Sequence, residues 1–484
     1  GLDSEPPFPE MDAAEWQTIH QQRLYTLFGI MRRLYDHIEA QGTFFVCATA
    51  MGGLFGFDTG GAENPAGGAI AGFAKAYQRE RPQAMVKIVD FSAQFDAEVV
   101  VAALLEETQY DAQVLEVGRL DDQRYSIGLR DEELKFDREA GLHLGPESVC
   151  LITGACGGIT SKIMAYMAEH AGGGIFHLLD RSDAPAADEA EWRELLHSDA
   201  NQLKRLIKEK MTADGQRATP AAIGRELERL ERSVQVADAM QVIVDAGGQA
   251  HYHQVDLLDE QNVQAAVADI VSTCDKVDLL LHAAGLEHSK AISDKKPEQF
   301  KLVYAVKLDG LYHLVRALDK TPIDTLLAFG SIAGRFGNSG QSDYAAANNA
   351  LVTYISALRR KRPEMTGLVI DWSAWKDVGM ATRGSIPQLM ERAGIEMLAP
   401  REAIPMVIRE LAAGSTGEVV LAGSLGILEP AESDSEELLS AKPARQVENM
   451  VMADELRAQA DGSMVAAAEL DPKVQPFLYD HQVE

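Results

Sequence analysis

Apolar runs recur along the second part of the chain, and stretches with helical periodicity separate them. Each run is almost continuous in Val, Ile, Leu and Phe instead of alternating with polar residues. A strand of this kind is buried on both faces, as in a parallel sheet that helices cover on both sides. The pattern predicts an α/β fold built on a doubly wound parallel sheet. The runs lie within 145–154 and at 175–179, 277–282, 325–329, 367–372 and 418–422.

The length of 484 residues favours two compact units joined by linkers. The larger unit is expected over 145–430, and a smaller α/β unit over 1–144. From Glu429 the chain becomes acidic and irregular, which predicts a linker over 431–469. The smaller unit is predicted from a helical pattern at about 15–41 and strand-like runs at 43–48, 85–90, 114–117 and 124–128.

Residues 187–246 are too many for the connection between two neighbouring strands, so we interpret them as a helical hairpin insertion. Thr219-Pro220 is a strong helix start, because the hydroxyl can cap the helix and proline fits its first turn. Apolar residues then follow at helical spacing until Gly247-Gly248 stops the helix. Such a stripe more often packs against the same protein than binds a partner.

The net charge of −29 argues against nucleic acid as a partner, because phosphates require a basic surface. No uncharged apolar run is long enough to span a membrane. The four cysteines are scattered, without C-x-x-C spacing, and no histidine cluster accompanies them. We therefore expect no disulfide, no metal site and a reducing, cytoplasmic setting.

A glycine-rich turn follows the first apolar run and opens a helix. Glycines there let the backbone approach a pyrophosphate, and the helix N-terminus favours its negative charge. The turn alone is a weak signal, but its βα context favours a dinucleotide site over an ordinary tight turn. Its candidate binding residues are Thr153, Gly154, Cys156, Gly157, Gly158 and Ile159.

Further candidate cofactor residues follow the next strands. Asp180 and Arg181 favour different cofactors, NADH and NADPH respectively, because a carboxylate repels a 2′-phosphate whereas a guanidinium binds it. We predict NADPH as the cofactor on the strength of Arg181. Asp256 could hydrogen-bond an adenine amine, and the small residues after His282 let a cofactor lie close. The remaining candidates are Ser182, Leu257, Ala283, Ala284 and Gly285.

Four polar residues form a candidate catalytic set. Ser331, Tyr344 and Asn348 are spaced by 13 and then 4 residues, and Lys307 lies 24 residues before Ser331. Hydride addition to a carbonyl leaves negative charge on oxygen, which one group must protonate and another must hold. We expect Tyr344 to be the acid, Ser331 the second donor and Lys307 the cation that lowers the phenol pKa. Asn348, one helical turn after Tyr344, would orient the group.

These motifs together resemble the short-chain dehydrogenase/reductase superfamily and, within it, the ketoreductase domains of polyketide synthases. The superfamily motif has lysine four residues after tyrosine, whereas this chain has Asn348 there and Lys307 upstream, an exchange typical of polyketide ketoreductases. The resemblance covers about 43–430. The motifs are the glycine turn, His282-Ala-Ala-Gly, Val306-Lys-Leu-Asp-Gly, Gly330-Ser-Ile-Ala-Gly and Gly340-Gln-Ser-Asp-Tyr-Ala-Ala-Ala-Asn348.

The resemblance implies a Rossmann-type catalytic subdomain that reduces a β-ketoacyl thioester with NADPH, preceded by a truncated, non-catalytic Rossmann-like subdomain. It also implies a substrate carried on the phosphopantetheine arm of an acyl carrier protein, within a multidomain polyketide or fatty-acid synthase. The insertion and the stretch 379–387, a candidate lid, are closer to iterative polyunsaturated-fatty-acid and enediyne synthases. Residues 470–484 resemble the start of a dehydratase domain, with His481 as its candidate base.

The sequence departs from that family at several places. Thr160 stands where many relatives have glycine, and Asp180 stands where a neutral residue is usual. The stretch after Gly285 lacks Leu-Asp-Asp, and Phe336 replaces the tryptophan eight residues before the tyrosine, so the alcohol configuration is not predicted.

A catalytically silent synthase domain and a free-standing dehydrogenase are the alternatives. The basic run 359–362 is either a carrier-protein contact or a helix-end charge balance.

Overall fold

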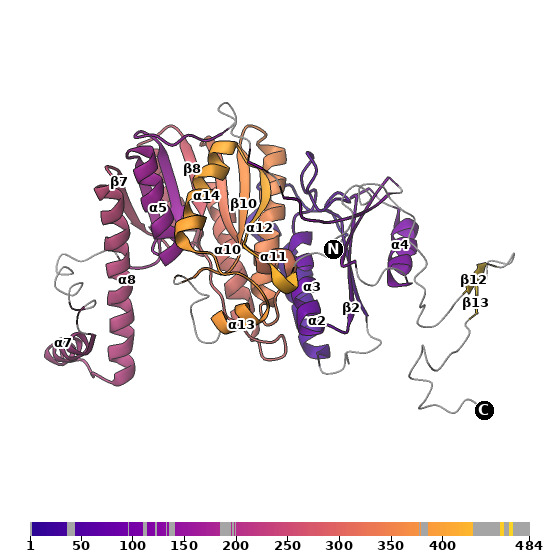
Figure 1. Cartoon of the computed structure of the whole chain (residues 1–484), viewed down its shortest axis with the longest axis horizontal. Helices are drawn as coiled ribbons and strands as arrows, with labels where there is room; N and C mark the ends of the chain where they lie inside the picture. The colour runs from indigo at the N-terminus through magenta and orange to yellow at the C-terminus, as the bar shows by residue number, and fades with distance from the viewer. Residues whose placement is uncertain are drawn as a thin grey trace.

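The structure, a computed structural model, contains two larger sheets and one short pair of strands. It describes residues 2–35, 44–94, 96–109, 114–121, 123–131, 133–134, 141–183, 195, 198, 200–376, 378, 386–428, 455–458 and 464–467. The predicted α/β fold is confirmed, because the larger sheet has seven strands and every neighbouring pair in it is parallel (Figure 1). None of the helices in these ranges is long and apolar enough to cross a lipid bilayer.

The seven strands have the order β11-β10-β9-β8-β5-β6-β7, so the chain reverses its direction of winding between β5 and β8. Ligands of doubly wound sheets bind at such a switch point, outside the carboxyl ends of the strands. The strands are β5 (Val149–Thr153), β6 (Ile175–Asp180), β7 (Gln249–Gln254), β8 (Val277–His282), β9 (Ile323–Ser331), β10 (Thr366–Trp372) and β11 (Gly417–Leu421).

Helices cover both faces of this sheet, and each face has its own apolar core. Buried residues of α9, α10 and α12 pack on one face. Residues of α5, α8 and α14 pack on the other. These helices are α5 (Gly158–Ala171), α8 (Pro220–Asp245), α9 (Glu260–Val271), α10 (Pro297–Ala317), α12 (Ser342–Lys361) and α14 (Pro400–Ala413); α11 (Ile332–Phe336) and α13 (Ile386–Arg392) lie in the connections.

The smaller sheet has the order β1-β2-β3-β4, with β4 antiparallel to β3. Its helix α3 packs along α12, so the two units share a continuous apolar core (Figure 1). The elements are α1 (Ala13–His20), the π turn η1 (Gln21–Tyr25), α2 (Thr26–Leu34), β1 (Phe44–Thr49), α3 (Gly67–Glu80), β2 (Met85–Phe91), α4 (Ala97–Gln109), β3 (Glu116–Leu120) and β4 (Gln123–Ser126).

The N-terminal helix starts earlier than its apolar pattern suggests, because Asp12 and Glu15 form a capping box at residue 13. A π turn then links α1 to α2, and the predicted end of this helix, at 36–41, lies outside the described residues. Among the predicted strands, boundaries differ from the observed ones by at most three residues, and 277–282 coincides with β8.

The insertion forms α7 (Ala200–Ala213) and the long helix α8. Helix α8 begins where the sequence predicts, with Thr219 Oγ1 accepting a hydrogen bond from the Ala222 amide. Its first half packs on α7 through Leu230 against Leu203 and Ile207, and its second half packs on the sheet. The apolar stripe is thus used for packing, and α7 lies at the end of α8 that projects from the sheet (Figure 1).

Within the predicted linker, two short strands pair antiparallel, β12 (Glu455–Ala458) and β13 (Met464–Ala467). The rest of 431–469 and the dehydratase-like stretch with His481 lie outside the described residues.

Candidate active site

The glycine turn sits at the switch point, where the carboxyl end of β5 lies between β6 and β8. Gly157 caps α5 without a side-chain hydrogen bond, so the first-turn amides point out of the helix without a protein cap. Gly154 has φ of +64°, and a Cβ there would lie 2.9 Å from the Ala284 backbone. The backbones of 154 and 284 therefore form a tight cradle beside the helix N-terminus, where the sequence predicts a dinucleotide phosphate.

Replacing Gly154 with alanine tests this cradle. We expect Gly154→Ala to lower the unfolding free energy by about 1–3 kcal/mol, from left-handed strain and overpacking, and to weaken NADPH binding. Thermal unfolding and cofactor titration measure both effects. Gly215→Ala is the matched control, because Gly215 has φ of +75° with no atom within 4 Å of its Cβ position. Equal losses of NADPH affinity in the two variants would contradict the cradle.

The predicted cofactor residues at the ends of β5 and β8 lie together. Thr153 Oγ1 accepts hydrogen bonds from the amides of Ala283 and Ala284, at 3.2 and 3.3 Å, and contacts His282 Nδ1 at 3.0 Å. His282 Nε2 in turn contacts the Lys307 carbonyl oxygen at 2.8 Å. Burial lowers the pKa of His282 to about 3, so the ring is neutral. His282 of β8 thus connects β5 with α10 through hydrogen bonds, a role that its motif did not predict.

The Asp180 carboxylate is held inside the glycine turn. It accepts hydrogen bonds from the Cys156 amide at 3.4 Å and from the Ser182 amide and hydroxyl at 3.1 and 3.0 Å. Arg181 is exposed beside it. Because local donors occupy the carboxylate, its repulsion of a nearby anion is reduced.

The third predicted strand end contributes Asp256 and Leu257. Asp256 Oδ1 accepts from the Leu258 amide at 3.0 Å, and its own amide donates to Asn262, so this side chain caps its loop. Leu257 is buried and packs toward Gly310 of α10. Ile159, in the first turn of α5, packs against the core on the sheet face that α5, α8 and α14 cover.

The structure brings Ser331, Tyr344 and Asn348 together at the carboxyl end of β9. Ser331 ends this strand and caps α11, with its hydroxyl oxygen accepting from the Ala333 amide at 3.2 Å. Tyr344 and Asn348 lie one turn apart on α12, and Asn348 Nδ2 donates to the Tyr344 carbonyl at 2.8 Å. Ser331 and Tyr344 are partly exposed, whereas Asn348 is buried.

The Tyr344 phenol is protonated at neutral pH. Burial raises its pKa to about 12, while hydrogen bonds with the side chains of Ser331 and Asn348 act in the opposite direction. Glu287 raises the phenol pKa further by its charge. A protonated phenol next to a second hydroxyl is the arrangement that proton donation to a developing alkoxide requires.

Lys307 is buried on α10, and its ammonium donates to the Phe329 carbonyl at 2.7 Å, two residues before Ser331. Its chain also lies against Gly285, where a Cβ would be 3.5 Å from Nζ. Burial lowers the Lys307 pKa to about 8, and the charge of Asp371 raises it. Lys301, six residues earlier on the same helix, is exposed and contacts Gln21 and the Tyr25 ring.

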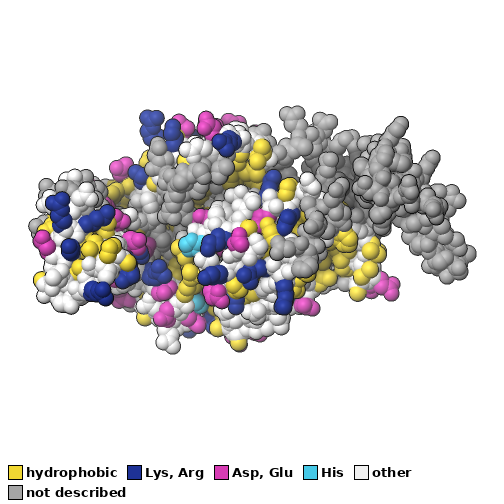
Figure 2. Space-filling model, turned by 90° about the horizontal axis from the view of Figure 1, so that it is seen from below, with side chains coloured by type: hydrophobic (Ala, Val, Ile, Leu, Met, Phe, Trp, Pro, Cys, Tyr) yellow, Lys and Arg dark blue, Asp and Glu magenta, His cyan; other side chains and the backbone are white. Residues whose placement is uncertain are grey.

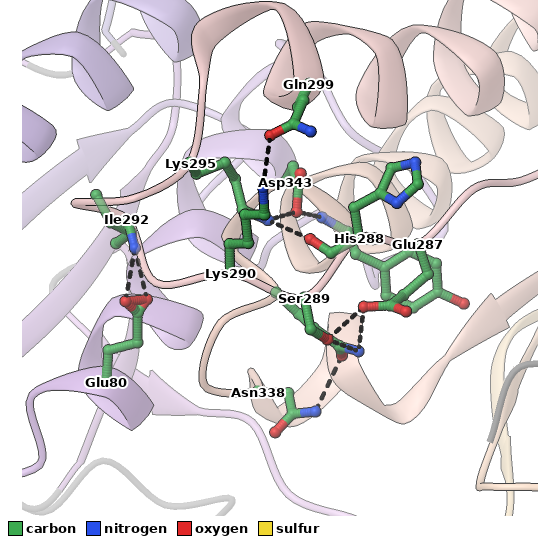
Figure 3. A network of polar contacts seen from close by, with 12 residues as sticks. Glu80, Glu287, His288, Ser289, Lys290, Ile292, Lys295, Gln299, Asn338 and Asp343 are labelled. Carbon is green, nitrogen blue, oxygen red and sulfur yellow. Dashed lines mark hydrogen bonds and ion pairs between the residues drawn. The ribbon is translucent and has the colours of Figure 1, made fainter. Parts of the chain in front are cut away.

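The loop after Gly285 is fixed from two sides (Figure 3). Lys295 is fully buried and forms an ion pair with Asp343, the residue before Tyr344, while donating to the His288 carbonyl at 3.1 Å. From the smaller unit, Glu80 accepts from the Ile292 amide at 2.9 Å. Neither contact was predicted, because each joins residues far apart in sequence.

The basic run at the end of α12 is largely neutralised. Arg360 pairs with Glu63, Lys361 with Glu10 and Arg362 with Asp319. On the face seen in Figure 2, basic and acidic side chains are interspersed. Three of the four basic residues in this run therefore have acidic partners within the chain. Of the candidate lid at 379–387, residues 379–385 lie outside the described residues, and α13 begins at Ile386.

Residues 148–377 match the family model described as KR domain. A polyunsaturated fatty acid synthase polypeptide of Thraustochytrium sp. (strain ATCC 26185 / S-3) is 28% identical over 289 residues, which cover 58% of this chain and 10% of that protein. Polyketide synthase PksL of Bacillus subtilis (strain 168) is 36% identical over 151 residues, 30% of this chain and 3% of PksL. The chain thus spans a tenth or less of these relatives.

Solved structures show the same fold. A ketoreductase domain from the bacillaene assembly line superposes with a TM-score of 0.63 at 17% identity, over 86% of this chain and 85% of that one. The first-module ketoreductase of phoslactomycin biosynthesis in Streptomyces sp. HK803 gives a TM-score of 0.61 at 19% identity, over 84% and 83%. With the sheet topology and the motifs, these matches lead to one conclusion: residues 148–377 of this chain match the KR domain family, and the chain is similar to the ketoreductase domains of polyketide synthases.

Proposed function

We propose that this chain reduces a β-ketoacyl thioester to the β-hydroxyacyl thioester, with NADPH as hydride donor. The observation that supports it most is the contact of Ser331 with a protonated Tyr344 at the end of β9, beside the switch point of the sheet, with the buried Lys307 ammonium bonded to the Phe329 carbonyl of the same strand. NADPH, when bound, supplies the hydride to the carbonyl carbon.

The side chains supply the rest of the chemistry. Ser331 would donate a hydrogen bond to the ketone oxygen and hold the charge that develops there. Tyr344 would transfer its phenolic proton to that oxygen. The Lys307 ammonium would stabilise the phenolate that remains, and Asn348, bonded to the Tyr344 carbonyl, would keep that turn of α12 in place.

Purified protein, NADPH and a β-ketoacyl thioester mimic test the proposal. We expect NADPH oxidation that depends on the thioester and yields the β-hydroxy product. A catalytically silent domain would bind NADPH without oxidising it. A free-standing dehydrogenase would prefer a ketone without the thioester. Either result would contradict the proposal.

NADPH preference rests on Arg181, which is exposed beside the glycine turn next to an Asp180 already held by local donors. We expect Arg181→Ala to raise the KM for NADPH by roughly 10- to 100-fold, since a hydrogen bond to a charged group contributes about 1.5–3 kcal/mol. The KM for NADH should change little, because NADH lacks the 2′-phosphate.

Arg217→Ala is the matched control for this prediction, because Arg217 is an exposed arginine in the turn between α7 and α8. It should leave both KM values unchanged. Equal effects of Arg181→Ala on NADPH and NADH would remove Arg181 from this role.

We also propose that the substrate arrives on the phosphopantetheine arm of an acyl carrier protein, within a multidomain synthase. The large size of the relatives supports this, since the matched segments are 10% and 3% of their lengths. On this proposal the segment 1–144 is a non-catalytic structural subdomain. In its sheet, Asp90 at the end of β2 accepts from Thr49 and from the amides of Met51 and Phe55, so the loop after β1 closes on this carboxylate.

A further inference from the structure

Behind the catalytic residues lies the buried carboxyl group of Asp371. Asp371 lies near the end of β10, opposite Gly330 of β9, and its side chain is fully buried. A Cβ at residue 330 would lie 1.9 Å from Asp371 Oδ1, so the carboxyl occupies the space that this glycine leaves next to Ser331. Within the described part of the chain, no donor hydrogen-bonds to either of its oxygens.

The group beside Asp371 is a second carboxyl, Glu418 of β11. Glu418 Oε2 accepts from Arg335 at 3.3 Å, whereas Oε1 is buried without a donor among the described residues. In the register of β10 and β11, Glu418 pairs with Val369, two residues before Asp371, and both the charge of Glu418 and a hydrogen bond with it raise the pKa of Asp371. Two carboxylates cannot hydrogen-bond to each other, so this contact requires one proton. A neutral Asp371 that donates to Glu418 Oε1 gives both orphaned groups a partner.

The charged groups around the pair favour that placement of the proton. Arg335 forms an ion pair with Glu418 at 3.3 Å and also pairs with Glu116 of β3. Burial and the neighbouring Glu418 both raise the pKa of Asp371 well above its usual value. The groups that face the pair from the adjacent elements are Lys75 of α3, Glu116 of β3, Lys307 of α10, Arg335 of α11 and Tyr344 of α12.

An ionised Asp371 would oppose the chemistry of the site. Its negative charge would raise the pKa of Lys307 and also that of Tyr344. A higher phenol pKa means a less stable phenolate and slower proton donation to substrate. Among the described residues, no ion pair is formed by Lys307, whose ammonium bonds the Phe329 carbonyl oxygen instead.

We propose that Asp371 is a positioning residue that stays a neutral carboxylic acid, hydrogen-bonded to Glu418. The Lys307 ammonium is thereby left without a counterion among the described residues. The positive charge of Lys307 then acts on Tyr344. The role in turnover rests on the proposed ketone reduction, whereas the shared proton does not. No cofactor or substrate is needed to form the pair.

The shared proton has a spectroscopic signature. A protonated carboxyl has a C=O stretching band that a carboxylate lacks, so the infrared difference between wild type and Asp371→Asn at neutral pH should show the loss of one such band. Asp319→Asn is the control, because Asp319 is an exposed partner of Arg362 and should contribute no such band. Loss of a carboxylate band in Asp371→Asn, without loss of the carboxylic-acid band, would overturn the proposal.

The effect on turnover is tested by changing the partner. Glu418→Gln can still accept from Arg335, but its amide can donate to Asp371 and so favours the ionised form. We expect kcat to fall about tenfold, equivalent to one pK unit at the phenol. The alkaline limb of the pH profile should move upward, because an ionised Asp371 raises the Lys307 pKa. NADPH affinity and the melting temperature should change little.

The double variant Asp371→Asn/Glu418→Gln separates this field from a structural role. It contains no carboxyl at either position, so kcat should recover and the alkaline limb should return toward the wild-type pH. Glu116→Gln is the matched control: it removes a carboxylate from the same guanidinium without offering Asp371 a donor, and should not move the limb upward.

These outcomes distinguish failure of this inference from failure of the proposed function. A double variant as slow as Glu418→Gln, or an alkaline limb that Asp371→Asn alone moves downward, would show that Asp371 is a charged counterion and overturn the inference. Absence of ketone reduction by the wild type would contradict the proposed function and leave the infrared result standing. If Glu418→Gln does not fold, the infrared spectrum and the pH profile of Asp371→Asn decide.

Discussion

Tyr344→Phe should lower turnover by about 10²–10⁴-fold, the contribution of one well-placed acid. The hydroxyl is the only group removed, and the ring still fills its place on α12. NADPH affinity should therefore stay near the wild-type value, so the loss should appear in kcat and not in cofactor binding. Steady-state kinetics with a β-ketoacyl thioester, together with a fluorescence titration of NADPH, measure the two quantities separately.

Tyr354→Phe is the matched control. Tyr354 lies on the same helix and is fully buried, and its hydroxyl contacts His20 Nε2 at 3.1 Å, away from Ser331. Loss of this buried hydrogen bond lowers stability by about 1 kcal/mol without removing an acid from the site. Near-wild-type turnover of Tyr344→Phe would rule out Tyr344 as the proton donor.

Lys307→Ala should lose most of its turnover and move the pH optimum upward. Lys307 has a pKa of about 8, so the wild type should slow as pH rises through this value and the ammonium loses its proton. Burial raises the phenol pKa to about 12 in the wild type, and loss of that cation should raise this pKa further and make the phenolate less accessible. The alkaline inflection near pH 8 should then disappear from the pH–rate profile.

Lys301→Ala is the control for this prediction, because Lys301 is exposed on the same helix and contacts Gln21. The double variant Lys307→Asn/Asn348→Lys moves the cation to α12, one turn from Tyr344, and should restore part of the activity. Normal turnover and an unchanged pH profile in Lys307→Ala, beside an inactive Lys301→Ala, would overturn the assignment.

The strands of the larger sheet were predictable because burial on both faces leaves a local trace in the sequence. Most positions in runs such as 277–282 are apolar, as a parallel sheet covered on both faces requires. The start of α8 was equally local, since Thr219 and Pro220 are adjacent and act on the same turn. Signals confined to a few neighbouring residues can be recognised from the sequence without knowledge of the fold.

The residues that support the site were not predictable in this way. His282 joins β5, β8 and α10, and Lys295 reaches Asp343 across 48 residues of sequence. Asp371 sits in an apolar strand, where its sequence context gives no sign that Glu418 lies beside it. Such partners are set by the register of neighbouring strands and by helix packing, which the sequence pattern does not specify residue by residue.

Transfer of deuterium tests the central claim most directly. Purified protein is given NADPH that carries deuterium at both C4 positions, together with a β-ketoacyl thioester, and the product is analysed by mass spectrometry and NMR. Direct hydride transfer predicts one deuterium, bound to the β-carbon of a β-hydroxyacyl thioester. Tyr344→Phe should form this labelled product only at its residual rate. Thioester returned unreduced by a folded, NADPH-binding protein, or a reduced product without deuterium at the β-carbon, would contradict the account.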